Sequence, residues 1–174
     1  MIKYQELTII IPTKNRSAYI NSLIEYYNEI NFDSTMIIAD SSDEVNFQII
    51  EDKISSKVWK YKITHLNTNI LDVSQSILQA TNHLKTKYCL QISDDDFLFD
   101  KGILNSIKFL NQNPNYVGCQ GRGISAFFSY TDNKVNCSNP FFYRMGGCEE
   151  NDPIKRVIHY SKEKKNIQFA IFKT

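Results

Sequence analysis

The sequence predicts an α/β fold built on a mainly parallel sheet. Short apolar runs rich in β-branched residues alternate along the chain with longer segments whose apolar side chains recur at helical spacing. The runs are continuous rather than alternating, as expected for strands that helices bury on both faces. Four of the runs end in polar clusters, and in parallel sheets such clusters meet at the carboxyl edge, where ligands bind.

The first strand and helix are the most strongly patterned part of the chain. Residues 7–11 are a β-branched strand that ends at Pro12, and Ser17 is expected to cap the helix that follows. A second buried strand covers 36–39 and leads into a helix over 45–57. These segments predict two successive strand–helix units of a parallel sheet.

Two further strand–helix units follow. A third strand is expected over 59–66, and Asp72 begins a capping box for a helix whose apolar positions extend to Leu84. The fourth strand covers 88–92, and Asp100 is expected to cap the next helix.

Beyond residue 116 the pattern changes to short aromatic segments separated by glycines and turn residues. The sequence at 132–134, Asp-Asn-Lys, predicts the turn of a β-hairpin. Pro153 fits the first turn of a helix that runs toward Ser161, and a terminal strand is expected over 167–172.

Size and composition limit the possible classes. With 174 residues and 42% hydrophobic content, the chain can bury one sizeable core, so we expect a single domain over 1–174. A net charge of +1 gives no sign of nucleic-acid binding. Four scattered cysteines without C-x-x-C spacing argue against a disulfide scaffold or zinc site. Without an export signal or membrane-spanning run, the expected compartment is the cytoplasm.

Three adjacent carboxylates, Asp94, Asp95 and Asp96, follow Ser93 at the end of the fourth strand. At about 5 Å and an effective dielectric near 20, each pair of these charges costs roughly 3 kcal/mol. The cluster therefore predicts a cation in the site, and oxygen ligands of this kind suit Mg²⁺ or Mn²⁺. The alternative is a solvated acidic turn before the next helix. Three other strands end in polar clusters, at 12–16, 40–43 and 67–69, which favours a shared site.

These motifs, taken in order, resemble those of the family 2, inverting glycosyltransferases of GT-A fold. The resemblance rests on the segment 9–16 (Ile-Ile-Ile-Pro-Thr-Lys-Asn-Arg), on Asp40, and on the segment 94–98 (Asp-Asp-Asp-Phe-Leu), and it covers roughly residues 6 to 110. It implies a nucleotide-sugar donor, usually UDP-linked, bound with Mg²⁺ or Mn²⁺. It also divides the domain into a nucleotide-sugar-binding part, 1–115, and a partial acceptor-side part, 116–174.

The resemblance assigns roles to the first two strand ends. Pro12, Thr13 and Arg16 would line the nucleotide pocket. Asp40 would accept a hydrogen bond from the imide N–H of a uracil base, and Ser42 or Asp43 would lie beside it.

The acidic triplet would correspond to the family's D-x-D motif, and two registers are open. Asp94 and Asp96 fit the motif literally, whereas aligning the apolar flanks places Asp95 at the usual metal position and Ser93 at the first acid. We favour Asp95 as the principal metal ligand, with Asp96 as a second ligand and Asp94 facing the nucleotide sugar.

The catalytic base is harder to assign. An inverting reaction needs a carboxylate that deprotonates the acceptor hydroxyl, and the candidates before the final helix are Asp152 and Glu150. The alternative for both is an acidic helix start. The family's arginine early in the third helix is not evident at 74–76. A catalytically incomplete nucleotide-sugar-binding module therefore stays open beside the transferase.

The sequence also bears on the acceptor and on one rival activity. The resemblance implies a glycan or lipid-linked acceptor in polysaccharide assembly. A sugar nucleotidyltransferase is a weaker alternative, because it would need a glycine-rich loop at 13–16. His65, His83 and His159 lack ligand spacing. A cluster of basic residues lies in and after the final helix. It is either a solvated face or a contact to anionic lipid at the inner face of the membrane. Its members are Lys155, Arg156, Lys162, Lys164 and Lys165.

Overall fold

The computed structural model describes residues 4–69, 72–131, 134–143, 146–162 and 170–174. The chain forms two compact units. The first comprises residues 1–119 together with 168–174, and the second comprises residues 120–167. The final residues thus belong with the first unit.

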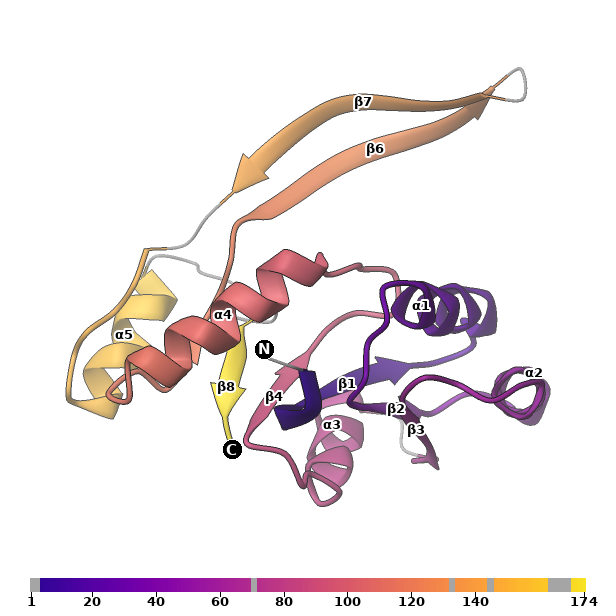
Figure 1. The fold of residues 1–174 in the computed structure, drawn as a ribbon, viewed down its shortest axis with the longest axis horizontal. Helices are drawn as coiled ribbons and strands as arrows, with labels where there is room; N and C mark the ends of the chain where they lie inside the picture. The colour runs from indigo at the N-terminus through magenta and orange to yellow at the C-terminus, as the bar shows by residue number, and fades with distance from the viewer. Residues whose placement is uncertain (1–3, 70–71, 132–133, 144–145, 163–169) are drawn as a thin grey trace. The chain divides into compact units, whose positions relative to one another are not determined.

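The first unit is built on a six-stranded sheet in the order β3-β2-β1-β4-β8-β5 (Figure 1). Strands β1 to β4 are parallel, and β8 runs antiparallel between β4 and β5. The predicted mainly parallel sheet is confirmed. The strands are β1 (Leu7–Thr13), β2 (Thr35–Asp40), β3 (Lys62–Asn67), β4 (Tyr88–Gln91), β5 (Gly118–Cys119) and β8 (Ile171–Lys173).

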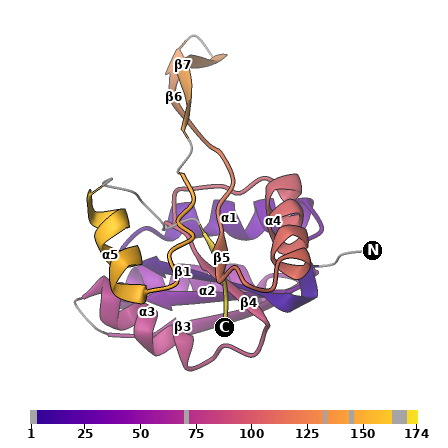
Figure 2. The ribbon, with the colours of Figure 1, turned by 90° about the vertical axis from the view of Figure 1, so that its left-hand side faces the viewer.

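Helices cover both faces of this sheet. A short 3₁₀ helix, η1 (Tyr4–Glu6), precedes β1. Figure 2 shows α1 and α4 on one side of the sheet and α3 on the other. Side chains of α2 join the same apolar cluster as those of α1 and α4. The helices are α1 (Ser17–Glu29), α2 (Glu44–Ser55), α3 (Val73–Thr81) and α4 (Asp100–Gln112).

Alternate residues of β1 supply the two layers of the core. Ile9 and Ile11 belong to the large cluster with α1, α2 and α4, whereas Ile10 packs in a smaller cluster with Ala80 of α3. All three isoleucines are buried. Full burial of such a side chain contributes about 1.5–3 kcal/mol, which explains why residues 9–11 of the strand are all apolar.

Two predicted helix caps are wrong by one position. Ser17 is the first residue of α1, with Arg16 at the N-cap, and its hydroxyl donates to Asn46 Oδ1 at 2.8 Å. Asp100 is likewise the first residue of α4, with Phe99 at the N-cap. A carboxylate in the first turn still favours the helix through its dipole. The cap of α3 is confirmed, because Asp72 accepts from the Ser74 N–H at 2.6 Å.

Other predicted boundaries shift. Helix α3 ends at Thr81, so Leu84 packs against the smaller cluster from beyond the helix. Strand β3 begins at Lys62, because the indole N–H of Trp59 donates to Ile54 O and ties that residue to the end of α2. The terminal strand is reduced to β8, and residues 167–169 of the predicted strand lie outside the described residues.

The second unit contains a hairpin and a helix. Strands β6 (Gly123–Thr131) and β7 (Lys134–Tyr143) pair antiparallel, as predicted, while the turn residues 132–133 lie outside the described residues. Helix α5 (Pro153–Lys162) begins at the expected proline. In the described part of the chain, no helix has both the length and the apolar character needed to cross a membrane.

Candidate functional site

The carboxyl ends of the central strands meet at one edge of the sheet, as the sequence predicts. Thr13 of β1 pairs with Asp40 of β2, and Asp40 pairs with Asn67 of β3. On the other side of β1, the Ile92 N–H donates to Ile10 O, so the segment after β4 leaves the sheet beside the end of β1. This register brings the acidic triplet next to the residues that follow β1.

Arg16 is the cation that the acidic triplet requires. Its Nη1 lies 2.8 Å from Asp94 Oδ1 and its Nη2 lies 2.8 Å from Asp95 Oδ2, so one guanidinium bridges two carboxylates. Thr13 donates its hydroxyl to the second oxygen of Asp94 at 2.7 Å. Asp94 is therefore held at both oxygens, and its side chain is only 6% exposed.

The other two acids are more open. The side chain of Asp95 is 46% exposed, and its hydrogen bond to Arg16 is the main cause of the raised pKa of that guanidinium. Burial raises the pKa of Asp96, and the negative charges of Asp95 and Asp94 add to the effect. Asp95 is thus the more open of these two carboxylates, whereas Asp96 is half-buried and hydrogen-bonded to Ser93; both are less enclosed than Asp94.

Aromatic residues of α1 hold this site in place. The Tyr26 hydroxyl donates to Leu98 O at 2.7 Å, and its ring meets the ring of Phe97 edge-on at 5.0 Å. The Arg16 guanidinium carbon lies 4.3 Å from the centre of the Tyr19 ring. These contacts position both the acidic segment and the arginine that bridges it.

Asp40 lies at the end of β2 in a closed polar network. It is 0% exposed. One oxygen accepts from the Ser42 N–H at 2.7 Å, and the other lies 3.0 Å from His65 Nε2. His65 contacts Glu51 through Nδ1 and stacks on Phe47 with ring centres 4.1 Å apart. A nucleobase could reach the Asp40 carboxylate only after this hydrogen-bond network opens.

The remaining predicted pocket residues lie around the turn after β1. Pro12 is half-buried in β1 opposite Ala39. Asn15 adopts a left-handed backbone conformation, with φ of 57°, and its N–H donates to Ser42 Oγ at 2.7 Å. Its side chain accepts from the Asp43 N–H at 2.8 Å, so the first two strand ends are joined directly.

Sequence reasoning missed two groups at this edge. The contact of His65 with Asp40 is one of them, and its signal in the sequence is that His65 lies two residues before the polar end of β3. A cluster of three hydroxyls, Ser41, Thr68 and Ser76, is tied together by contacts of 2.7 to 3.1 Å at the ends of β2 and β3 and the start of α3. Separate positions in the sequence gave no sign of this cluster.

The triplet fits a divalent cation that is shared with a ligand. Among the described residues, no three His, Cys, Asp or Glu side chains converge to hold a metal by themselves. Mg²⁺ is commonly held by one or two carboxylates together with phosphate oxygens rather than by a cage of protein ligands. Asp95 and Asp96 match that requirement, whereas Asp94 is already saturated by Thr13 and Arg16.

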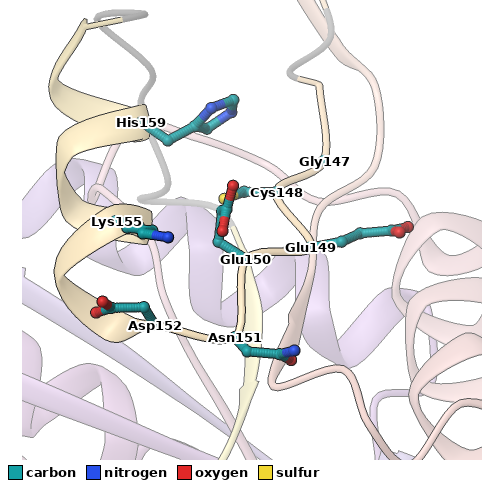
Figure 3. Close-up of a pocket in the computed structure, with 8 residues that line it drawn as sticks. All are labelled: Gly147, Cys148, Glu149, Glu150, Asn151, Asp152, Lys155 and His159. Atoms are coloured by element: carbon teal, nitrogen blue, oxygen red, sulfur yellow. The ribbon is translucent and has the colours of Figure 1, made fainter.

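The predicted base candidates line a hollow of the second unit, about 510 Å³ in volume. In Figure 3, Glu150 and Lys155 extend into the space between the loop and α5, while Glu149 and Asn151 point away from the helix. Asp152 accepts from the Ile154 N–H at 2.8 Å, so it caps α5. Asp152 therefore has the helix-start contact that the sequence offered as the alternative to catalysis.

The sheet topology, with polar strand ends gathered at its carboxyl edge, defines an α/β domain of GT-A type. The chain belongs to the family Glycosyl transferase family 2, whose model matches residues 8–172. The family predicted from the sequence motifs is thereby confirmed. No curated protein matches the chain.

Solved structures share this fold. The mannosyltransferase PcManGT from Pyrobaculum calidifontis, in complex with GDP-Man and Mn²⁺, matches with a TM-score of 0.54 and 16% identity, over 65% of this chain and 34% of its own. S. aureus TarS 1-349 matches with a TM-score of 0.51 and 20% identity, over 63% of this chain and 33% of its own. The chain thus spans about a third of each of these two structures.

A third solved structure has a similar fold. CMP:2-keto-3-deoxy-manno-octonic acid synthetase in complex with CTP matches with a TM-score of 0.51 and 8% identity, over 97% of this chain and 74% of its own. At such identities the three likenesses show the fold alone.

Proposed function

We propose that the chain binds a nucleotide-diphosphate sugar, with UDP as the favoured nucleotide, and transfers the sugar to a glycan or lipid-linked acceptor with inversion. The observation that carries this proposal is the bridge from Arg16 to Asp94 and Asp95 at the carboxyl edge of the sheet. The site combines a cation that suits phosphate oxygens with carboxylates that suit a divalent metal.

In the proposed donor complex, the residues after β1 bind the nucleotide. Thr13 keeps Asp94 oriented through the 2.7 Å hydrogen bond, so this carboxylate faces the nucleotide sugar in a fixed position. Arg16 contacts the diphosphate, for which a guanidinium is geometrically suited. Pro12 forms the wall of the pocket. Ser42 and Asp40 select the nucleobase, with Asp40 reached once its contact with His65 opens.

Asp95 and Asp96 are the proposed ligands of Mg²⁺ or Mn²⁺. When bound, such a cation neutralises charge on the departing diphosphate. The mannosyltransferase neighbour was solved with Mn²⁺ and GDP-Man, which supports testing Mn²⁺ first and testing GDP beside UDP.

The acceptor half of the reaction is assigned to the second unit. Glu150 is the preferred base over Asp152, because the carboxylate of Asp152 is engaged in capping α5. The base removes the proton of the acceptor hydroxyl as the new glycosidic bond forms. We place this reaction in polysaccharide assembly, in the cytoplasm at the inner face of the membrane.

Nucleotide binding with and without Mn²⁺ tests the donor site. We expect UDP to bind by isothermal titration in the presence of Mn²⁺, and Asp95→Asn to weaken that binding at least tenfold, because it removes a proposed ligand. Asp52→Asn, an exposed acid on α2, is the matched control and should bind like the parent. Equal binding by both variants, or no binding of UDP or GDP, would refute the proposal.

A nucleotide-sugar-binding module without transfer activity is the second candidate, because Asp152 serves as a helix cap. Donor binding without transfer or hydrolysis of a UDP-sugar would favour the module. The sugar nucleotidyltransferase alternative predicts instead the formation of a nucleotide sugar from a nucleoside triphosphate and a sugar phosphate. The family match favours transfer over that reaction.

A further inference from the structure

One face of the β6–β7 hairpin is apolar at the positions whose side chains the structure describes. Residues paired across an antiparallel ladder lie on the same face, and successive residues of a strand lie on opposite faces. Ile124 pairs with Phe142, and Phe128 pairs with Cys137. With Ala126 between them and Val135 nearer the turn, this apolar hairpin face consists of Ile124, Ala126, Phe128, Val135, Cys137 and Phe142.

A β-bulge keeps the face continuous. Between two ladder pairs, β6 advances from Ser125 to Phe127 while β7 advances by three residues, from 138 to 141. Asn139, one of the two residues of β7 between these pairs, has a left-handed φ of 49°. Without this bulge, Phe142 would fall on the opposite face, so the bulge is what aligns it with Phe128.

The opposite face of the hairpin is mostly polar. It carries Ser125, Phe127, Ser129, Thr131, Lys134, Asn136 and Phe141. Both faces are accessible, since Phe128 and Phe142 are 70% and 71% exposed and Phe127 is 67% exposed. A two-stranded hairpin with an uncovered apolar face is marginal in water, so the apolar hairpin face requires an occupant.

Helix α5 of the same unit is also amphipathic. Ile154, Val157 and Ile158 follow helical spacing and are exposed, and the rest of the helix carries Lys155, Arg156 and Lys162. Residues 120–167 contain eight lysines and arginines against five aspartates and glutamates, an excess of +3, whereas the rest of the chain carries twelve against fourteen. The apolar side chains thus lie in the basic part of the protein.

We infer that the apolar hairpin face and the apolar stripe of α5 bind the surface of an anionic lipid bilayer. Exposed phenylalanines beside basic residues are the combination that binds the headgroup region of such bilayers. The open edges of the two strands keep the hairpin at the interface, because unpaired backbone groups are not tolerated in the hydrocarbon core. This inference rests on the proposed membrane location of the transferase and names the surface that provides it.

A second copy of the chain is a less suitable occupant. At about 3.4 Å per residue and 4.8 Å between strands, the apolar hairpin face covers on the order of 300 Å², and stable interfaces bury about 800 Å² per partner. Two copies would also bring together two units that each carry an excess of +3.

Co-sedimentation of the full chain with vesicles tests the inference. We expect binding to vesicles with 30% phosphatidylglycerol and weaker binding to pure phosphatidylcholine. Phe128→Ser combined with Phe142→Ser should lower the partition coefficient about tenfold or more, and Lys155→Gln with Arg156→Gln roughly fivefold per charge. Phe127→Ser, on the polar face, is the matched control and should bind like the parent.

Three results would overturn the inference. These are no binding to anionic vesicles, equal losses for Phe127→Ser and Phe128→Ser, and a parent dimer in sedimentation velocity that Phe128→Ser dissociates, which would make a second copy the occupant. Far-UV circular dichroism checks folding of each variant. UDP binding is measured separately, so failure of membrane binding and failure of the donor site are distinguishable.

Discussion

Replacing Arg16 by glutamine removes the guanidinium that bridges Asp94 and Asp95. In the parent, each carboxylate lies 2.8 Å from a guanidinium nitrogen. Glutamine cannot supply positive charge, so Asp94 keeps only the hydrogen bond from Thr13 while the repulsion among the three acids is no longer offset. The variant is therefore expected to be less stable.

The expected loss is about 2–3 kcal/mol. Asp94 is nearly buried but Arg16 is 39% exposed, so this pair lies between an exposed ion pair, worth about 0.2–1 kcal/mol, and a broken buried pair, which costs about 3–5 kcal/mol. We take about 2 kcal/mol for it. The pair with Asp95, exposed on both sides, adds less than about 1 kcal/mol.

Urea unfolding followed by circular dichroism measures this loss, and the thermal midpoint should fall by about 5–10 °C. A double-mutant cycle with Asp94→Asn isolates the pair, because Arg16→Gln should cost little once that charge is gone. Asp95→Asn serves as the milder comparison. The reasoning fails if Arg16→Gln loses less than about 0.5 kcal/mol, or if its cost is unchanged in the Asp94→Asn background.

Three further predictions concern charge, packing and helix propensity. The pKa of Asp96 is raised in the folded protein, so the ionised carboxylate weakens the fold above that pKa. Asp96→Asn should therefore raise the urea midpoint at pH 7, and this gain should vanish as the pH falls through the raised pKa of Asp96. A gain that stays constant with pH would refute this prediction. Leu23→Ala, fully buried in α1, should cost about 2–5 kcal/mol in urea unfolding, against less than about 0.5 kcal/mol for exposed Leu78→Ala. Gly102→Ala in α4, where a Cβ meets nothing within 4 Å, should raise stability by about 0.5–1 kcal/mol, and a loss would contradict the free space.

Much of the fold followed from local pattern. The β-branched run of β1 and the helical spacing in α1 and α4 are short-range signals, and their elements appear within a few residues of the predicted ranges. The errors fall at the ends. Ser17 and Asp100 are good capping residues, but the backbone enters each helix one residue earlier than their side chains suggested.

The partners of buried charges could not be predicted in the same way. Asp40 and His65 are neighbours only because β2 and β3 pair in parallel register, 25 residues apart in sequence. The composition of the two hairpin faces depends on the β-bulge near Asn139, because the bulge places Phe142 on the same face as Phe128. Each of these contacts is set by long-range pairing rather than by neighbouring residues.

By itself, the sequence determined the family and the order of apolar and polar segments along the chain. It also determined the need for a cation beside three adjacent acids, because like charges at short range must be offset. Only the tertiary structure decided which protein group offsets them. The parallel pairing of β1 with β4 brings Arg16 to Asp94 and Asp95, so the first cation of the site belongs to the chain itself. A metal would then share with the diphosphate only the carboxylate oxygens of Asp95 and Asp96 that this arginine leaves open.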